Sequence, residues 1–403
     1  MKKHPFLLFI LILFLDLLII LTLCLLPGKV LDPSSGPEPF DVRDLKYKIL
    51  KDGTLRITEY RGNADVIDLP SGIAGRRVSV IGWKSFAECG RLKSVTLPGS
   101  VTVVEGSAFW NCRNLARVTL PDSVTVPEAN PFAGCSQLEI VLSPSHPALT
   151  FSDGLLLTRD GSRLIAYTGS LISPSLTVPE SVTEIGPKAF AYTELASVTI
   201  PGHVSFIGDS AFSGCGNLSS VILPRSLTAV EAYTFEGCSS LSSVVIPEAV
   251  TRIGEYAFHW CGRLDSAVIP EAVIDIGSHA FEMSGLSSAV LPSGLSRIER
   301  STFWNCKNLV SVAIPDSVTE IGSSAFGHCP LLSDVSIPGN VESIENYAFS
   351  RCPSLTSLRL PDSLRKIGRD VFSGCDSLTL TVTGGAFLEN YCRRAGLKYI
   401  CSE

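Results

Sequence analysis

Cysteine is the residue type whose spacing in this sequence most resembles a chemical pattern. Ten of the thirteen cysteines follow a phenylalanine by three residues. Thiols brought together by such a repeat could form disulfides, bind a metal ion or act as nucleophiles. However, neither a Cys-x-x-Cys pair nor a cluster of histidines accompanies them, as a zinc site would require. The ten are Cys89, Cys112, Cys135, Cys215, Cys238, Cys261, Cys306, Cys329, Cys352 and Cys375.

The histidines indicate no catalytic group either. They share no offset within the repeat that would gather them, and His328 beside Cys329 is the one pair with the composition of a dyad. Gly-x-Ser-x-Gly, His-Glu-x-x-His and phosphate-loop motifs do not occur in the sequence. We therefore predict a protein that is not an enzyme and uses no cofactor or metal. The six histidines are His4, His146, His203, His259, His279 and His328.

The cysteines belong to a unit of about 23 residues that recurs along the chain, most clearly at residues 318–338. A fixed period of this size is the signature of a solenoid, in which each unit buries its apolar face on its neighbours. The sequence thus predicts one elongated domain, although 403 residues would otherwise suggest two or three. The phenylalanines that mark the units are Phe86, Phe109, Phe132, Phe190, Phe212, Phe235, Phe258, Phe281, Phe303, Phe326, Phe349 and Phe372.

Each unit contains signals for two short strands and several corners. Val335 and Ile337 are spaced as alternate inward residues of a strand, and the proline after them ends it. A second extended piece, such as residues 182–185, ends at the corner formed by Gly186. The pair Ala189-Phe190 fits a single helical or 3-10 turn. We expect an α/β repeat solenoid that is mostly β, with about twelve units stacked as a rod.

Stacking would place the ten cysteines in one column. Parallel stacking points their Cβ atoms in the same direction and not at each other, so we interpret them as buried thiols that act as small hydrophobes. The units at residues 191–195 and 282–286 lack the cysteine and are followed by a 22-residue step. We expect a tightened turn to have removed the position of the cysteine, here called the cysteine slot, in these two units. Cys392 and Cys401 are the remaining candidates for a disulfide.

The N-terminal segment predicts attachment to a membrane. Residues 6–26 are almost entirely apolar and long enough to span a bilayer as a helix. Lys2 and Lys3 precede this run, which favours an inside N-terminus and an extracellular repeat domain in a single-pass protein of the cell membrane. An uncleaved anchor within residues 1–28 is our preferred interpretation. Secretion after cleavage of a signal peptide is the alternative.

Further boundaries follow from composition and turn signals. Residues 29–45 are rich in proline, serine and glycine and read as a linker. The Asp52-Gly53 pair predicts a hairpin, hence an N-terminal β cap at 46–80. The repeats would then occupy 81–381, with a C-terminal helical cap at 382–403.

The repeat is interrupted between Phe132 and Phe190, which are 58 residues apart instead of 46. Two Asp-Gly pairs within residues 140–175 predict a small hairpin that protrudes from the rod. Loops that depart from a regular scaffold often carry binding, although a role in packing alone is the alternative. The candidate residues of this insertion loop are Phe151, Asp153, Arg159 and Tyr167.

One outward column of the main strand becomes apolar in four consecutive units. It reads threonine before these units and alanine, serine and arginine after them. Contiguous exposed apolar surface commonly marks a protein contact, so we predict a face for a partner or for self-association. The alternative is plain β-propensity. The four residues of this apolar stripe are Ile222, Val245, Val268 and Val290.

Composition narrows the kinds of partner. The net charge is −6 and the charges form no basic cluster, which excludes nucleic acid as a partner. A carbohydrate surface would call for clustered exposed aromatic residues. Trp110, Trp260 and Trp304 follow unit phenylalanines but lie in separated units, so the sequence favours this function less.

The unit Val-Thr-x-Ile-Gly-x-x-Ala-Phe-x-x-Cys-x-x-Leu-x-Ser-Val-x-Ile-Pro resembles the BspA-type leucine-rich repeat of bacterial surface proteins. The resemblance covers residues 46 to 403, from the opening at Tyr60-Arg-Gly62 to a last segment that looks like the helical end of the family. It implies a leucine-rich-repeat rod that mediates adhesion to proteins on host or neighbouring cells. A structural spacer that organises the cell envelope without a specific ligand is the rival function.

Overall fold

The computed structural model describes residues 39–169, 174–383 and 386–402. The expected membrane segment at 6–26, the N-terminal segment 1–28 and most of the linker 29–45 lie outside these residues. Within the described ranges, no helix has the length and apolar character needed to cross a membrane. The compact part begins at Phe40 rather than at residue 46, because Phe40 packs on the core and Leu45 is already buried. The predicted end of the linker was therefore too late.

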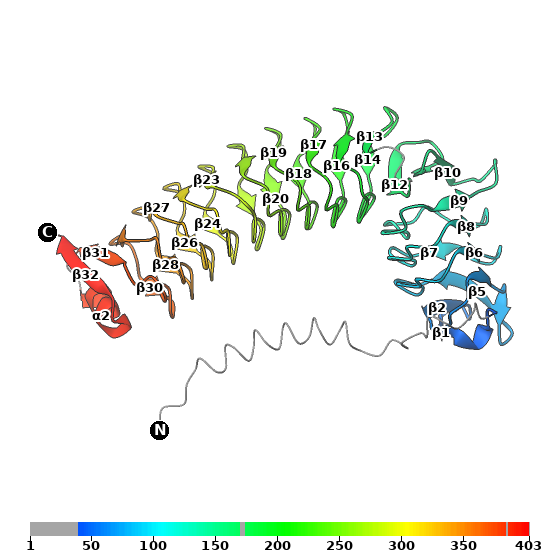
Figure 1. Ribbon diagram of the computed structural model, residues 1–403, viewed down its shortest axis with the longest axis horizontal. Coiled ribbons are helices and arrows are strands. Elements are labelled where there is room, and N and C mark those ends of the chain that lie inside the picture. Colours follow the sequence, from blue (N-terminus) through cyan, green and yellow to red (C-terminus); the bar gives the residue numbers. More distant parts are fainter. Residues whose placement is uncertain (1–38, 170–173, 384–385, 403) are drawn as a thin grey trace, which may run out of the picture. The chain divides into compact units, whose positions relative to one another are not determined.

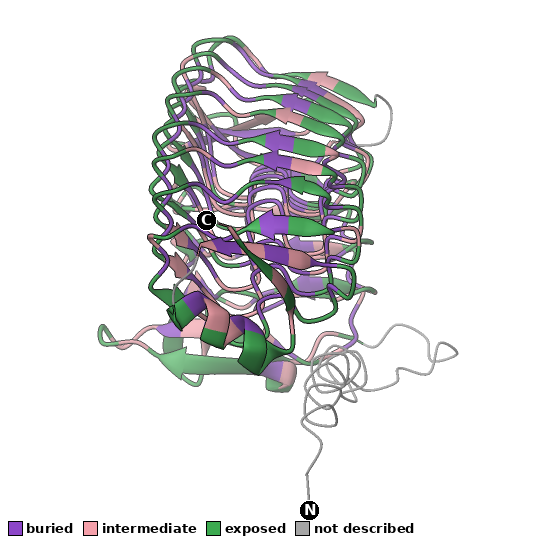
Figure 2. Cartoon of the chain, turned by 90° about the vertical axis from the view of Figure 1, so that its left-hand side faces the viewer, coloured by how far each residue is buried: buried purple, intermediate pink, exposed green. Residues whose placement is uncertain are grey.

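The predicted solenoid is confirmed, and its main strands run parallel from coil to coil (Figure 1). The middle residue of each three-residue strand points inward while both neighbours face outward, an alternation visible in Figure 2. Serine pairs with serine and valine with valine across neighbouring coils, as Ser197 does with Ser220 and Val198 with Val221. The main strands are β3 Val66–Asp68, β6 Ser94–Thr96, β8 Arg117–Thr119, β9 Glu139–Val141, β13 Ser175–Thr177, β15 Ser197–Thr199, β17 Ser220–Ile222, β19 Ser243–Val245, β21 Ser266–Val268, β23 Ser288–Val290, β25 Ser311–Ala313, β27 Asp334–Val335, β29 Ser357–Arg359 and β31 Thr379–Thr383.

A second series of two-residue strands stacks beside the main strands. In most of them the second residue is a buried isoleucine or valine, and a corner follows. These strands are β7 Val103–Val104, β14 Glu184–Ile185, β16 Phe206–Ile207, β18 Ala229–Val230, β20 Arg252–Ile253, β22 Asp275–Ile276, β24 Arg297–Ile298, β26 Glu320–Ile321, β28 Ser343–Ile344 and β30 Lys366–Ile367.

The third side of each coil is a row of tight turns rather than the helical or 3-10 turn we expected. In the coil of Phe258, the amides of Ala257 and Cys261 close turns on the carbonyls of Gly254 and Phe258. The third residue of each turn, Tyr256 and Trp260, has a left-handed backbone with φ of 55° and 58°. A left-handed residue at this place defines a type II turn and interrupts any helix.

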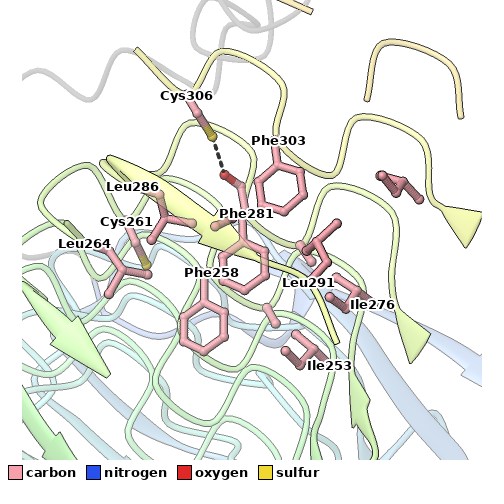
Figure 3. Packing of buried hydrophobic residues seen from close by; sticks show 14 of the residues in the cluster. Ile253, Phe258, Cys261, Leu264, Ile276, Phe281, Leu286, Leu291, Phe303 and Cys306 are labelled. Atoms are coloured by element: carbon pink, nitrogen blue, oxygen red, sulfur yellow. Dashed lines mark hydrogen bonds between the residues drawn. The ribbon is translucent and has the colours of Figure 1, made fainter. Parts of the chain in front are cut away.

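The aromatic residues form the centre of the core. The rings of successive phenylalanines stack nearly parallel, with centroids 4.9 to 5.8 Å apart. Figure 3 shows this stack at Phe258, Phe281 and Phe303 with isoleucine and leucine packed around it. Because a buried phenylalanine contributes about 3–5 kcal/mol by truncation, this column is a main source of stability.

The cysteines form a ladder with the backbone. Nine of the ten thiols donate to the carbonyl oxygen of the phenylalanine in the preceding coil, with Sγ to O distances of 2.9 to 3.2 Å. The contact of Cys306 with Phe281 is drawn in Figure 3. Burial raises the pKa of the Cys215 thiol to about 11 and that of Cys306 to about 12. These two thiols are therefore protonated at neutral pH, and all cysteines of the described part are free.

The two units without a cysteine keep the slot, contrary to our expectation. Thr193 and Ser284 stand three residues after Phe190 and Phe281. Their hydroxyls lie 3.4 and 3.3 Å from the thiols of the next coil. The missing residue of the 22-residue step falls between this position and the following leucine, so a hydroxyl replaces the thiol there.

Both ends of the described stack are capped. At the N-terminal end, η1 Val42–Asp44 precedes the hairpin of β1 Leu45–Ile49 and β2 Leu55–Tyr60, and β4 Gly72–Ile73 pairs with β5 Arg76–Ile81. At the other end lie α2 Ala386–Ala395 and β32 Lys398–Ser402, which pairs in parallel with β31. Cys392 is buried in this helix while Cys401 is exposed, and both thiols are free.

Candidate functional site

The apolar stripe predicted on the main strands is exposed. Ile222, Val245, Val268 and Val290 have exposed fractions of 64%, 71%, 59% and 70%. They end strands β17, β19, β21 and β23, whose middle residues are buried or partly buried. Val245 and Val268 are register partners and lie side by side in the parallel pairing of β19 and β21. The stripe is thus a real feature of the surface and not an inward face misread from the sequence.

The insertion is a hairpin that joins the stack, so the prediction of a protruding hairpin was wrong. Strand β10 Leu149–Ser152 pairs with β11 Leu155–Thr158, and β11 pairs with β12 Arg163–Tyr167. Strand β12 then runs parallel to β14 of the next coil, which makes the insertion one of the layers.

The four candidate residues of the insertion are not gathered into one site. Tyr167 is buried, and its ring lies 5.9 Å from that of Phe190, in the aromatic column. Phe151 packs partly against the core of the preceding coils. Asp153 and Arg159 are exposed, and Asp153 occupies a left-handed turn position with φ 51°. Tyr167 is therefore a structural residue, and only the two charged residues remain available to a partner.

The hairpin repeats the design of the N-terminal cap. Asp160-Gly161 turns β11 into β12 as Asp52-Gly53 turns β1 into β2. Tyr60 heads the ring column before Phe86, at 5.5 Å, as Tyr167 does before Phe190. Each tyrosine is followed two residues later by a glycine, Gly62 or Gly169, where an added Cβ would lie within 2.5 Å of the tyrosine hydroxyl.

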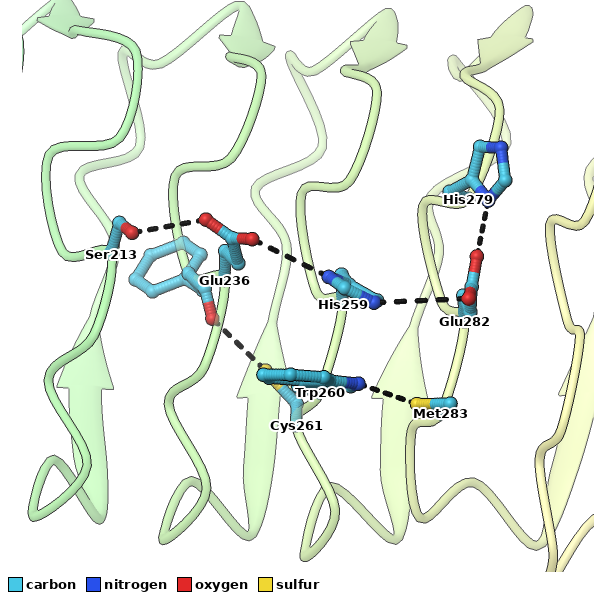
Figure 4. A network of polar contacts seen from close by, with 9 residues as sticks. Ser213, Glu236, His259, Trp260, Cys261, His279, Glu282 and Met283 are labelled. Carbon is cyan, nitrogen blue, oxygen red and sulfur yellow. Dashed lines mark hydrogen bonds and ion pairs between the residues drawn. The ribbon is translucent and has the colours of Figure 1, made fainter. Parts of the chain in front are cut away.

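A chain of acidic and imidazole side chains runs along the turns of neighbouring coils (Figure 4). Ser213 Oγ donates to Glu236 Oε2 at 3.1 Å, and Glu236 Oε1 lies 3.5 Å from His259 Nδ1. His259 Nε2 lies 3.8 Å from Glu282 Oε1, and the other oxygen of Glu282 contacts His279 Nδ1. The expectation that the histidines are not gathered was wrong for these two, because positions two before and one after the phenylalanine face the same row of turns.

Aromatic rings accompany this polar network. The rings of Tyr233 and Tyr256 stack at 4.9 Å, and those of Tyr256 and His279 at 4.4 Å. Trp260, with 56% of its surface exposed, stacks beside His259 at 5.2 Å. Alternating acids and imidazoles with exposed rings can hold a cationic or hydroxyl-bearing group.

The arrangement of the thiols separates them from these polar groups. Cys261 follows Trp260, but its thiol donates inward to the Phe235 carbonyl at 3.1 Å. Cys329 likewise donates to the Phe303 carbonyl, while the ring of His328 lies 5.1 Å from that of Trp304. Burial, with the nearby Arg351 charge, lowers the pKa of His328. Among the residues that the structure describes, no group of three acidic, histidine or cysteine side chains is placed to hold a metal ion.

Two solved structures of leucine-rich proteins are similar to this chain. A leucine-rich cell surface protein from Faecalibacterium prausnitzii A2-165 is similar at 28% identity, over 92% of this chain and 97% of that chain, with a TM-score of 0.50. A leucine-rich repeat protein from Bacteroides ovatus ATCC 8483 is similar at 25% identity, over 91% of this chain and 100% of that chain, with a TM-score of 0.44. No curated protein matches the chain.

The family model for the BspA type leucine rich repeat region matches in six copies, over residues 65–152, 165–287 and 274–391. These residues include the whole series of phenylalanine coils and parts of both caps. The resemblance inferred from the repeat is confirmed. This chain belongs to the family of BspA-type leucine-rich repeat proteins.

Proposed function

We propose that the chain is a non-catalytic protein of the cell surface that binds another protein through the apolar stripe of strands β17 to β23. The observation that carries this proposal is the exposure of Ile222, Val245, Val268 and Val290 on consecutive coils. An aligned row of exposed aliphatic side chains is unfavourable in water unless a partner covers it. The similar F. prausnitzii protein is described as a cell surface protein, which supports the location.

β-Propensity alone explains the stripe less well. The same outward position holds Thr199 before the stripe and Ala313 after it, although these residues stand in equally regular strands. A preference for β-branched residues is met equally by threonine, so it does not explain why four consecutive coils carry purely aliphatic side chains instead. From β13 to β29, valine and isoleucine occupy this position in four consecutive coils and in no other, which favours a contact of limited length.

We further propose that residues 6–26 tether the repeats to the membrane. The support is the sequence alone, namely an apolar run long enough to span the bilayer after two lysines. A tethered solenoid would present its strand face to proteins on host or neighbouring cells.

Cell adhesion tests this function directly. The full chain is displayed on a non-adherent bacterium, display is checked by protease accessibility, and adhesion to host cells and clumping of the bacteria are both counted. The double variant Val245→Lys/Val268→Lys is expected to lose adhesion or clumping at least tenfold, because two charges would have to be desolvated in the contact. Loss of clumping would identify a second copy as the partner.

The matched control is Thr228→Lys/Thr251→Lys, which adds the same charges to exposed positions beside strands β18 and β20 of the same coils. This control is expected to adhere like the original chain. Equal adhesion of the stripe variant, or no adhesion and no clumping by a well-displayed chain, would reject the binding function in favour of a spacer in the cell envelope.

A further inference from the structure

A hollow opens on the row of turns, on a different side of the coils from the apolar stripe. It measures ≈170 Å³ and is lined by residues of the coils around Phe86, Phe109, Phe190, Phe212 and Phe235. This volume equals about six water molecules at roughly 30 Å³ each, which is the size of one sugar ring rather than of a drug-sized ligand.

The hollow exists because the turn of Phe132 displays no large outward side chain. Asn130 is buried and turns inward, where its oxygen accepts from the Phe132 amide at 2.7 Å and its nitrogen donates to the Lys188 carbonyl at 2.9 Å. Ala133 and Gly134 occupy the positions after the phenylalanine. Side chains from the coils on either side lean over this gap.

Two lysines converge on the hollow from opposite sides. Lys188 Nζ lies 3.2 Å from Ser107 Oγ, and Lys84 Nζ lies 4.5 Å above the ring of Trp110. Neither forms an ion pair with a carboxylate among the described residues, although most other charged groups of these coils do. Burial, followed by the Lys84 charge, lowers the pKa of Lys188. Two unpaired ammonium groups held near each other are stabilised by an anion between them.

The other walls suit the body of a sugar. The rings of Trp110 and Tyr192 meet edge to face at 5.9 Å, and Tyr192 is 44% exposed. Aromatic rings provide apolar faces that combine packing with polar tips. The hydroxyl of Ser107 can donate to or accept from sugar hydroxyls, and the carboxylate of Glu236, which also lines the hollow, can accept from them.

We propose that this hollow binds an anionic sugar residue, with its acidic group between Lys84 and Lys188 and its ring against Trp110 and Tyr192. The site is independent of the protein contact proposed for the apolar stripe. It places a carbohydrate on aromatic residues that are separated in the sequence but lie on either side of the turn of Phe132, which displays no large outward side chain.

Calorimetric titration of the full chain in detergent tests the site. The ligands are glucuronate and glucose 6-phosphate as anionic sugars, glucose as the neutral sugar, and acetate and inorganic phosphate as anions without a sugar. We expect at least one anionic sugar to bind at least tenfold more tightly than glucose and than its own simple anion. Tighter binding of glucuronate would identify the acidic group as a carboxylate, and tighter binding of glucose 6-phosphate would identify it as a phosphate.

Lys84→Gln and Lys188→Gln are each expected to weaken that binding about tenfold or more, whereas Lys188→Arg retains it because the charge is kept. Lys307→Gln, which removes an exposed lysine elsewhere, is the control and binds unchanged. Thermal melting confirms that each variant is folded. The proposal is overturned if neither anionic sugar binds, if glucose or the simple anions bind as tightly, or if the two glutamine variants bind like the original chain. The stripe variant Val245→Lys/Val268→Lys retains sugar binding, so this site and the protein contact fail separately.

Discussion

The interior of the coils hardly changes along the stack, whereas the row of turns changes at almost every coil. The interior positions are phenylalanine with a thiol or hydroxyl three residues later, and nine of the ten thiols donate to the phenylalanine carbonyl of the preceding coil. Two residues before the phenylalanine, by contrast, stand Lys188, Ser210, Tyr233, Tyr256 and His279 in succession.

This difference shows how the coil separates folding from recognition. Backbone amides on both sides of each phenylalanine donate to the next coil, as Ser324 does to Asn346 and His328 to Ser350, so side chains at these positions are not needed for stacking. The turns keep their left-handed geometry with lysine, tyrosine, tryptophan or histidine in place. Each such residue costs about 1–3 kcal/mol of strain, which the stack sustains.

The contrast between the constant interior and the variable turns is tested most strongly at alkaline pH, because the interior thiols titrate there. A thiol ionises near pH 8.5 in the unfolded chain but near 11 in Cys215 and near 12 in Cys306. The unfolded state releases its protons first, so the stability is complete below about pH 8.5 and falls as the pH rises through the folded pKa. Between pH 8.5 and 10 the loss is about 2 kcal/mol per thiol.

Urea unfolding at pH 8 and pH 10 measures this loss. The double variant Cys215→Ser/Cys306→Ser lacks both titrating groups, and its stability is expected to fall by about 4 kcal/mol less than that of the original chain over this range. If both proteins lost the same stability between pH 8 and pH 10, the thiols of the column would not titrate as buried groups.

The glycines test the spacing between coils. At Gly254 an added Cβ would lie 2.5 Å from the Ala232 nitrogen and 2.6 Å from the Glu231 carbonyl carbon. Gly254→Ala is therefore expected to lower the free energy of unfolding by about 3 kcal/mol, because the clash is with backbone that must move. Gly262→Ala, where no atom lies within 4 Å, is expected to stay within about 0.5 kcal/mol. Denaturant titration compares the pair, and equal effects would contradict tight stacking at the corner.

The turn and strand surfaces are expected to respond differently to the same substitution. Ser324 has a φ of 57°, whereas Ser220 lies in the extended strand β17 and is exposed. Ser324→Val should destabilise by about 2 kcal/mol, because a β-branched residue is strained in the left-handed region. Ser220→Val should change the stability by no more than about 0.5 kcal/mol. Thermal and urea unfolding are measured for both variants. Equal losses of stability would show that the turns are not strained.

The smallest effect is expected within the cysteine slot. Thr193 and Ser284 show that a hydroxyl can replace the thiol, so Cys261→Ser should retain a donor to the Phe235 carbonyl. Cys261→Ala leaves that carbonyl without the donor and should be about 1 kcal/mol less stable than Cys261→Ser. The measurement is the difference in urea midpoint, and a more stable alanine variant would show that the thiol acts by packing alone.

The sequence predicted the repetitive part of the fold well, because one period determined the aromatic column, the inward residues and the corners together. It predicted a helical turn at Ala189-Phe190 because neither residue reveals a left-handed neighbour. It also missed that Thr193 and Ser284 fill the cysteine slot, although both stand at the same offset. Comparing residues by offset, rather than by identity, would have found them.

The candidate sites were predicted unevenly. The stripe from Ile222 to Val290 followed from the alternation of a strand, which fixes which side chains point outward. The pairing of His259 with Glu282, and of Lys84 with Lys188, depends on which turns become neighbours. For the lysines this includes the hairpin, which lets the turns of Phe132 and Phe190 meet, as the bond from the Asn130 amide to the Pro187 carbonyl shows. Because the insertion between Phe132 and Phe190 has an irregular length, the repeat period alone does not predict this contact.

The hairpin of residues 149–167 also divides the hydrophobic interior in two. Leu156 and Ala166 pack with the coils before it, while Leu155 and Leu164 pack with the coils after it. In a repeat protein, stability passes from each layer only to its neighbours, and a weak junction limits how far unfolding spreads. Fraying that starts at α2 can therefore travel back to this layer and stop there. We therefore expect the chain to unfold as two cooperative blocks, in which the coils around Lys84 stay folded while those bearing the stripe open.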